Sequence, residues 1–217
     1  MVALTQAPSV LWYFARAAGF VSLLLLTAAV CVGVALSLRL RTPRWPTFVT
    51  EGLHRYLSTV LLVFITIHVA TLLLDPFEKF SVQDVLIPFV SKYRTFWMAL
   101  GICAAELVAA FALSVYIRKI IGYRAWRVLH YGTYALFPLS LLHGIGAGTD
   151  THSWWGVAIY LVAAIPVILL VFWRASLSTS GKGAPTNEAL SSRPVAGISP
   201  EAGHLARRSA PVDRPVG

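Results

Sequence analysis

The stretches HRYLSTVLLVFITIH, residues 54–68, and HYGTYALFPLSLLH, residues 130–143, decide the fold. Each begins and ends with a histidine, and Arg55 is the one charged residue between the histidines of either pair. Both stretches lie in runs long enough to cross a bilayer, which takes about 20 apolar residues. An ionisable side chain in hydrocarbon is costly, so four histidines in two such runs predict a functional site.

The spacing of the histidines predicts two levels of ligands. His54 and His68 are 14 positions apart, and His130 and His143 are 13 apart, which corresponds to about 20 Å along a helix at ~1.5 Å per residue. Imidazole is the commonest metal ligand among side chains and a standard axial ligand of haem iron. Ligands this far apart on one helix cannot share a single zinc or copper ion. We therefore expect His54 to face His130, and His68 to face His143.

Helix phase supports this arrangement for only one of the two stretches. Fourteen residues return to within about 40° of the starting face, whereas thirteen miss it by about 140°. Pro138 lies inside the second stretch. A proline can kink or overwind a helix, and we expect it to reduce this mismatch.

Composition places the chain among membrane proteins. Hydrophobic residues make up 57% of the 217 residues and charged residues only 12%, whereas a soluble domain carries about 25% charged residues. The mean hydropathy is +0.71. We expect an all-α integral membrane protein in contact with the lipid bilayer, with no nucleic-acid partner.

Five apolar runs are long enough to span a membrane, at about residues 17–38, 49–74, 95–117, 125–145 and 154–172. They predict a five-transmembrane-helix bundle as one domain, residues 17–173, after an N-terminal segment, residues 1–16. Residues 174–217 are rich in Ser, Pro, Gly, Ala and Arg, which predicts a disordered tail. Between the second and third runs, SVQDVLIPFV is apolar enough to lie in the membrane interface as a short helix or turn.

The basic residues predict the orientation. Residues 39–44 and 118–127 carry seven Lys or Arg and no acidic residue. The positive-inside rule places these loops and the C-terminal tail in the cytoplasm and the N-terminus outside, in a plasma or inner membrane. The pair His54 and His130 then lies near the cytoplasmic face.

The spacing H-x13-H on one span and H-x12-H two spans later resembles the ferric reductase-like transmembrane domain family, over about residues 10–173. That family includes the membrane part of NADPH oxidases and ferric reductases, and the haem-binding membrane subunit of the methionine-sulfoxide reductase system. The cytochrome b of bc-type complexes has similar histidine pairs. The resemblance implies two b haems, with iron held by His54, His68, His130 and His143.

The resemblance also implies electron transfer across the membrane. No GxGxxG motif follows a predicted strand, and the 44-residue tail is too short and polar to form a flavin or nicotinamide domain. We therefore expect an oxidoreductase component whose electrons come from a quinol or from the flavin of a cytoplasmic partner. The acceptor would lie on the outer side, as a periplasmic or extracellular redox protein or as ferric iron.

Haem propionates are anionic, so arginines near the membrane faces are candidate contacts. Arg55 and Arg127 flank the inner histidines, and Arg16 and Arg94 lie near the outer level. Each equally suits a topology signal or a snorkelling anchor. Glu106 lies mid-span, where it is a candidate for proton relay or quinone binding.

Two other functions compete with electron transfer. A transporter whose histidines relay protons or bind a metal ion would predict broken paired helices and inverted repeats, which the sequence lacks. A non-catalytic haem-binding anchor for a partner reductase has the same sequence features as the electron-transfer protein, so the two stay open.

Overall fold

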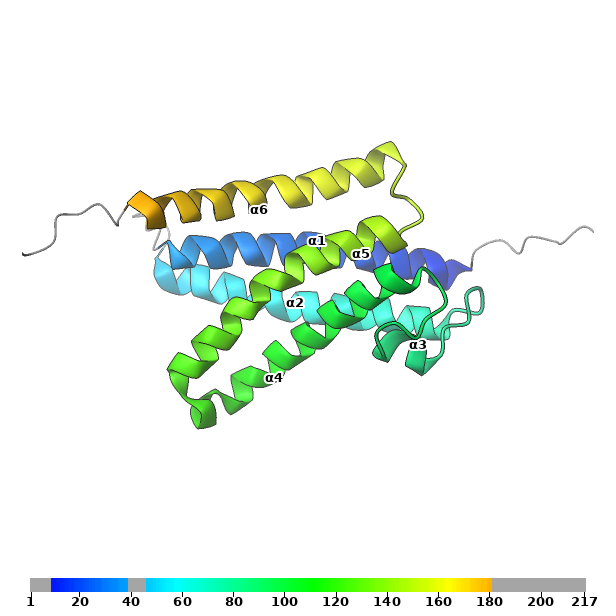
Figure 1. Ribbon diagram of the computed structural model, residues 1–217, viewed down its shortest axis with the longest axis horizontal. Coiled ribbons are helices and arrows are strands. Elements are labelled where there is room, and N and C mark those ends of the chain that lie inside the picture. Colours follow the sequence, from blue (N-terminus) through cyan, green and yellow to red (C-terminus); the bar gives the residue numbers. More distant parts are fainter. Residues whose placement is uncertain (1–8, 39–45, 181–217) are drawn as a thin grey trace, which may run out of the picture. The chain divides into compact units, whose positions relative to one another are not determined.

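The computed structural model describes residues 9–38 and 46–180, and the described part is helical without strands (Figure 1). The elements are α1 (Val10–Ser37), α2 (Thr47–Leu74), α3 (Val82–Leu86), α4 (Thr95–Tyr131), the 3₁₀ helix η1 (Gly132–Ala135), α5 (Leu136–Ala147) and α6 (Trp154–Ser180). Helix α1 begins inside the predicted N-terminal segment, and α6 continues past the predicted end of its span. The tail predicted to be disordered lies outside the described residues from residue 181 onward.

Helices α1 and α2 form an antiparallel pair that is tied at one end by polar side chains. Ser9 caps α1, because its hydroxyl oxygen accepts a hydrogen bond from the Trp12 amide at 3.1 Å. The same hydroxyl donates to Asp75, which follows the last residue of α2 and precedes Pro76. This tie fixes the register of the two helices at the end that also carries His68.

Helix α4 reverses direction at Gly122, which has φ 78° and ψ 157°. A side chain would be strained in this conformation, whereas glycine adopts it readily. From Thr95 to Ala147 the chain would measure about 80 Å if straight, but the Tyr93 hydroxyl donates to the Ala147 carbonyl at 3.2 Å. The two limbs therefore run antiparallel, as Figure 1 shows.

The prediction of a loop over residues 118–127 is therefore wrong. Its basic residues lie on helical turns on either side of the single non-helical residue Gly122. The short helix predicted within residues 81–90 is present as α3. Its capping box joins the Ser81 and Asp84 side chains to each other's backbone amides. The Ser81 hydroxyl and the Ser81 backbone amide also both donate to the Asp84 carboxylate, at 2.5 and 2.9 Å, and these bonds hold the pKa of that carboxyl below its usual range.

The 3₁₀ segment η1 corrects the phase between His130 and His143. A 3₁₀ helix turns about 120° per residue instead of about 100°, so its four residues add about 80° of rotation. The mismatch falls from about 140° to about 60°, similar to the offset of about 40° on α2. Pro138 accounts for the overwinding, because it has no N–H for the Tyr134 carbonyl and its ring crowds that carbonyl.

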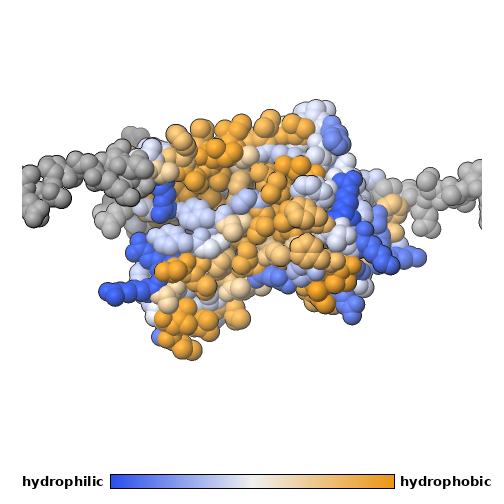
Figure 2. Space-filling view, viewed as in Figure 1, coloured by the Kyte–Doolittle hydropathy of each residue, from blue (hydrophilic) through white to orange (hydrophobic). Residues whose placement is uncertain are grey.

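Four helical segments are long and apolar enough to cross a membrane: Val10–Ser37, Thr47–Leu74, the reversing Thr95–Ala147, and Trp154–Leu177. On the face that Figure 2 shows, apolar residues cover the middle of the helices, and hydrophilic residues gather toward their two ends. Large apolar side chains are exposed in the middle of the spans, such as Val63 at 52% and Ile165 at 51%. Such exposure suits lipid, so the chain is a multi-pass membrane protein.

Candidate functional site: two histidine pairs

The structure brings the four histidines together as two pairs. The imidazole of His54 on α2 lies 6.2 Å from that of His130 on α4, measured between ring centroids, with the planes at 84°. His68 on α2 and His143 on α5 lie 6.3 Å apart, with planes at 80°. All four side chains are half-buried. The pairs are those that the spacing predicts, and each joins helices that do not follow each other in the chain.

This separation matches two imidazoles on opposite sides of one metal ion. A metal–imidazole nitrogen bond is about 2.0–2.1 Å, and the nitrogen lies roughly 1.1 Å from its ring centroid. Two such ligands in line place their centroids about 6.3 Å apart. Direct contact between the rings would bring them closer, and unrelated histidines have no reason to repeat the same spacing at two levels. Each pair could therefore hold one ion between its two imidazoles.

Hydrogen bonds to backbone carbonyls orient three of the four imidazole rings. The Nδ1 atoms of His54, His68 and His143 lie 3.0, 2.7 and 2.9 Å from backbone carbonyl oxygens, those of Ala29, Ala15 and Trp97 respectively. A carbonyl accepts only, so Nδ1 carries the proton and the Nε2 lone pair is left to bind metal. Ligating histidines almost always donate their second ring nitrogen in this way.

A glycine stands four residues after each of these three carbonyls. A Cβ atom at Gly19 would meet the His68 ring at 3.2 Å, one at Gly33 would meet His54 at 3.2 Å, and one at Gly101 would overlap His143. The missing side chains let each imidazole reach the helix backbone. Sequence reasoning missed these glycines, although Gly19 and Gly33 are 14 positions apart, the same spacing as their histidines.

His130 is held differently from the other three. No carbonyl lies within hydrogen-bonding distance of its ring nitrogens in residues 9–38 and 46–180. Instead, its ring stacks on Trp126 at 5.1 Å and 20°, and the Arg118 guanidinium lies over the indole at 5.3 Å. The Trp126 N–H is buried and has no partner among the described residues. Stacking thus takes the place of the carbonyl bond at this histidine.

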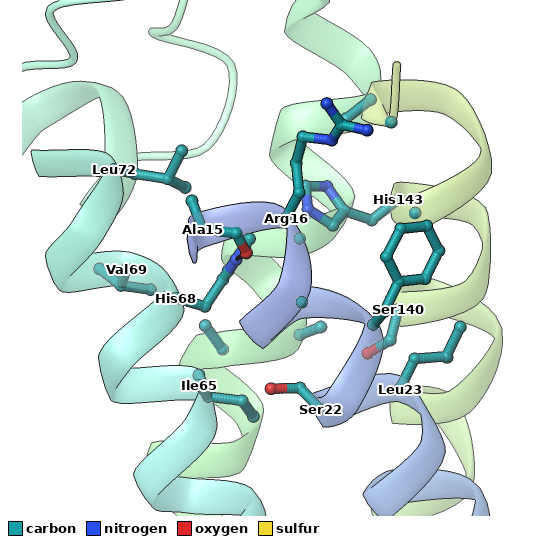
Figure 3. Close-up of a pocket in the computed structure, with 18 of the residues that line it drawn as sticks. Ala15, Arg16, Ser22, Leu23, Ile65, His68, Val69, Leu72, Ser140 and His143 are labelled. Atoms are coloured by element: carbon teal, nitrogen blue, oxygen red, sulfur yellow. Dashed lines mark hydrogen bonds between the residues drawn. The ribbon is translucent and has the colours of Figure 1, made fainter. Parts of the chain in front are cut away.

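A cavity of about 180 Å³ surrounds the pair His68 and His143. Figure 3 shows the two imidazoles directed into it from opposite sides, with Arg16 beside His143. Most of the wall is apolar, with side chains such as Leu23 and Val69. Arg16 and Asp150 form an ion pair at its edge. The Arg16 Nε–H is buried without a partner in the described part of the chain, so it is available to a bound anion.

The other predicted arginines lie in different surroundings. Arg94 donates to the carbonyls of Gly146 and Gly148 at 2.6 and 3.4 Å, and so covers the carbonyl end of α5. Arg127 is exposed and interacts with a tyrosine hydroxyl. Arg55 is exposed on α2 next to His54. A propionate role for these residues stays a prediction.

The donor set favours haem iron over other ions. Within the described residues, no group of three or more His, Cys, Asp or Glu is placed to hold a metal ion. Zinc needs about four protein ligands or three with water, whereas haem iron receives four ligands from the porphyrin and needs only two from protein. Two histidines per level fit haem, and so does the mostly apolar wall of the cavity around His68 and His143.

Comparison with known proteins settles the family. The family described as ferric reductase like transmembrane component matches residues 18–141, more than half of the chain. The chain belongs to this family. It is a membrane redox component, as the resemblance predicted. The matched region contains His54, His68 and His130 and ends just before His143. No curated protein and no solved structure matches the chain.

Two further polar residues of this ferric reductase-like chain lie outside the pairs. Glu106 on α4 is exposed at mid-span and does not line the cavity around His68 and His143. His152 is exposed in the turn between α5 and α6. Neither contributes to the two pairs.

Proposed function

We propose that this protein transfers electrons across the membrane as a di-haem b-type cytochrome. One haem would be held by His54 and His130, and the other by His68 and His143. The observation that carries the proposal is the repeated ring separation of 6.2 and 6.3 Å, which suits one iron between each pair. When bound, haem supplies one-electron redox chemistry.

The residues of the chain orient the histidine rings of the two sites and keep water away from them. The Nδ1–H bonds to Ala15, Ala29 and Trp97 fix the ring tautomers and raise the basicity of the ligands. Apolar side chains around His68 and His143 exclude water from that level. The two levels are about 20 Å apart along α2, so one lies toward each membrane face.

The topology we propose has five crossings. The reversal at Gly122 makes the segment Thr95–Ala147 cross twice, which adds one crossing to the four apolar segments. The basic residues around Gly122 then lie in the cytoplasm, and so does the C-terminal end of α6. The N-terminus would be outside, and the pair His68 and His143 would be the outer one, in a plasma or inner membrane.

A site near each face suits a donor and an acceptor on opposite sides. We propose a quinol or a cytoplasmic flavoprotein as donor, and a redox protein or ferric iron outside as acceptor. Among the predicted propionate contacts, Arg16 has the best position, because it lies at the wall of the outer cavity with an unpartnered N–H. Arg55, Arg94 and Arg127 remain candidates of the same kind.

Absorption spectroscopy of the purified protein tests the proposal. We expect two haems per chain, both low-spin and six-coordinate, in the oxidised and the dithionite-reduced protein. Near-perpendicular imidazole planes should also give a strongly anisotropic low-spin ferric EPR signal. Metal analysis provides the control, since a zinc or copper site would bind metal without haem absorption. A folded protein without haem would refute the proposal.

A further inference from the structure

Helix α6 places a polar side chain at each of the two histidine levels. The Tyr160 hydroxyl donates to the carbonyl of Gly144 at 2.6 Å, next to His143, so Tyr160 stands at the outer level. Arg174 follows 14 residues later, about 21 Å along the helix. This spacing equals that of His54 and His68 on α2. Arg174 therefore stands at the inner level.

The contacts of Arg174 confirm this placement. Its guanidinium donates to the Ser37 hydroxyl at 2.9 Å and to the Tyr134 hydroxyl. Ser37 lies one turn after Gly33, which touches the His54 ring, and Tyr134 lies one turn after His130. Two different helices thus bring Arg174 within about a turn of both inner ligands.

Arg174 is also held in position by an aromatic surface. Its guanidinium carbon lies 5.9 and 5.6 Å from the ring centroids of Tyr131 and Tyr134. These two rings stack on each other at 6.4 Å and 18°. The guanidinium therefore turns inward between α1 and η1, rather than outward to lipid headgroups.

The positive charge of Arg174 has no carboxylate partner among the described residues, where the Arg16–Asp150 pair is the sole ion pair. Its hydrogen-bond partners are neutral hydroxyls, and the side chain is half-buried. A guanidinium has five N–H donors arranged to bind a carboxylate in a bidentate manner. A preorganised cation with spare donors suits an anion.

We propose that Arg174 binds a propionate carboxylate of the inner haem, the one held by His54 and His130. This inference rests on the proposed function and adds a contact from α6 to that haem. Ferric haem carries one more positive charge than ferrous haem, so a nearby cation favours reduction. Removing the cation should make the inner haem harder to reduce.

A redox titration of variants tests the proposal. In Arg174→Gln, we expect the reduction equilibrium of the inner haem to fall about tenfold, a shift of about 59 mV to lower potential. The inner haem is identified as the one that His54→Ala removes. The outer haem should not shift. Arg174→Lys keeps the charge and should show a smaller shift. Arg124→Gln is the matched control, because Arg124 is exposed at the same end of the molecule.

The outcomes separate this inference from the proposed function. Two bound haems with unchanged potentials in Arg174→Gln would overturn the inference and leave the proposed function intact. A wild-type protein without haem would overturn both. If Arg174→Gln does not fold, Arg174→Lys decides: a small shift of the inner haem alone to lower potential supports the inference, and unchanged potentials of both haems overturn it.

Discussion

Replacing Gly101 by alanine tests whether the close approach of α4 to His143 positions an iron ligand. A Cβ atom at Gly101 would stand 2.5 Å from Cε1 and 2.7 Å from Cγ of His143. Non-bonded carbon atoms prefer about 3.5 Å, so the ring must withdraw by roughly 0.8–1.0 Å. A metal–ligand bond tolerates about 0.2 Å. The shift would also lengthen the 2.9 Å bond to the Trp97 carbonyl.

We therefore expect Gly101→Ala to keep the inner haem and lose most of the outer one. Gly33→Ala should have a weaker effect on the inner haem, because its Cβ meets His54 at 3.2 Å and the ring needs to move only a few tenths of an ångström. Gly52→Ala is the matched control, since nothing lies within 4 Å of its Cβ. Alanine favours a helix over glycine by about 0.5–1 kcal/mol, so helix propensity cannot explain a loss.

The assay is haem content per chain, measured from the reduced absorption spectrum and the protein concentration. Wild type and Gly52→Ala should contain two haems, and Gly101→Ala about one. Helical circular dichroism checks that the variants are folded. Two haems with unaltered potentials in Gly101→Ala would show that the glycine does not position a ligand, and that the close contact is ordinary helix packing.

Three other predictions follow from the same geometry. His54→Ala and His130→Ala should remove the same haem, seen as the same loss in a redox titration; losses of different haems would break the proposed pairing. A topology reporter fused after residue 180 should report cytoplasm, and one within residues 146–152 should report the outside; the reverse would exchange inner and outer levels. Hydrogen bonds lower the pKa of Asp84 in the folded protein. They therefore stabilise α3 at pH values above the pKa of an aspartate in the unfolded chain, and this stabilisation is lost as the pH falls through the lowered pKa of the folded protein. Amide exchange protection of α3 should fall on acidification, and Asp84→Asn should reduce the pH dependence.

The histidine pairs and the membrane class could be predicted from the sequence because both depend on residue type. A histidine in an apolar run is conspicuous, and equal spacing on two runs leaves few explanations. The reversal at Gly122 was harder, because the basic residues around it looked like a loop. They lie on helical turns instead, since only one residue had to leave helical geometry. Basic residues therefore indicate where the chain leaves the membrane, but they do not indicate where a helix ends, because that depends on the backbone conformation.

The hydrogen bonds from the histidines of α2 to the backbone of α1 could not be predicted from single residues, because Ala and Gly are common in membrane helices and carry no functional groups. The signal was a shared period. Gly19 and Gly33 repeat at 14 residues, as do Ala15 and Ala29, whose carbonyls accept the histidine bonds. On antiparallel helices, equal spacing brings both members of each set into register at once.

Among the described residues, the His130 ring has no hydrogen bond to a backbone carbonyl, and this has a physical consequence. A bond from Nδ1–H to a carbonyl makes an imidazole a more basic ligand, which favours the more positive ferric iron. Both outer histidines have such a bond, whereas at the inner level, within the described residues, only His54 has one and His130 stacks on Trp126 instead. The cations Arg118 and Arg174 lie near the same inner pair. At the outer level the charge of Arg16 is instead paired with Asp150. If the two pairs hold haems as proposed, ligand basicity and charge act in the same direction, and we expect the inner haem to be easier to reduce than the outer one.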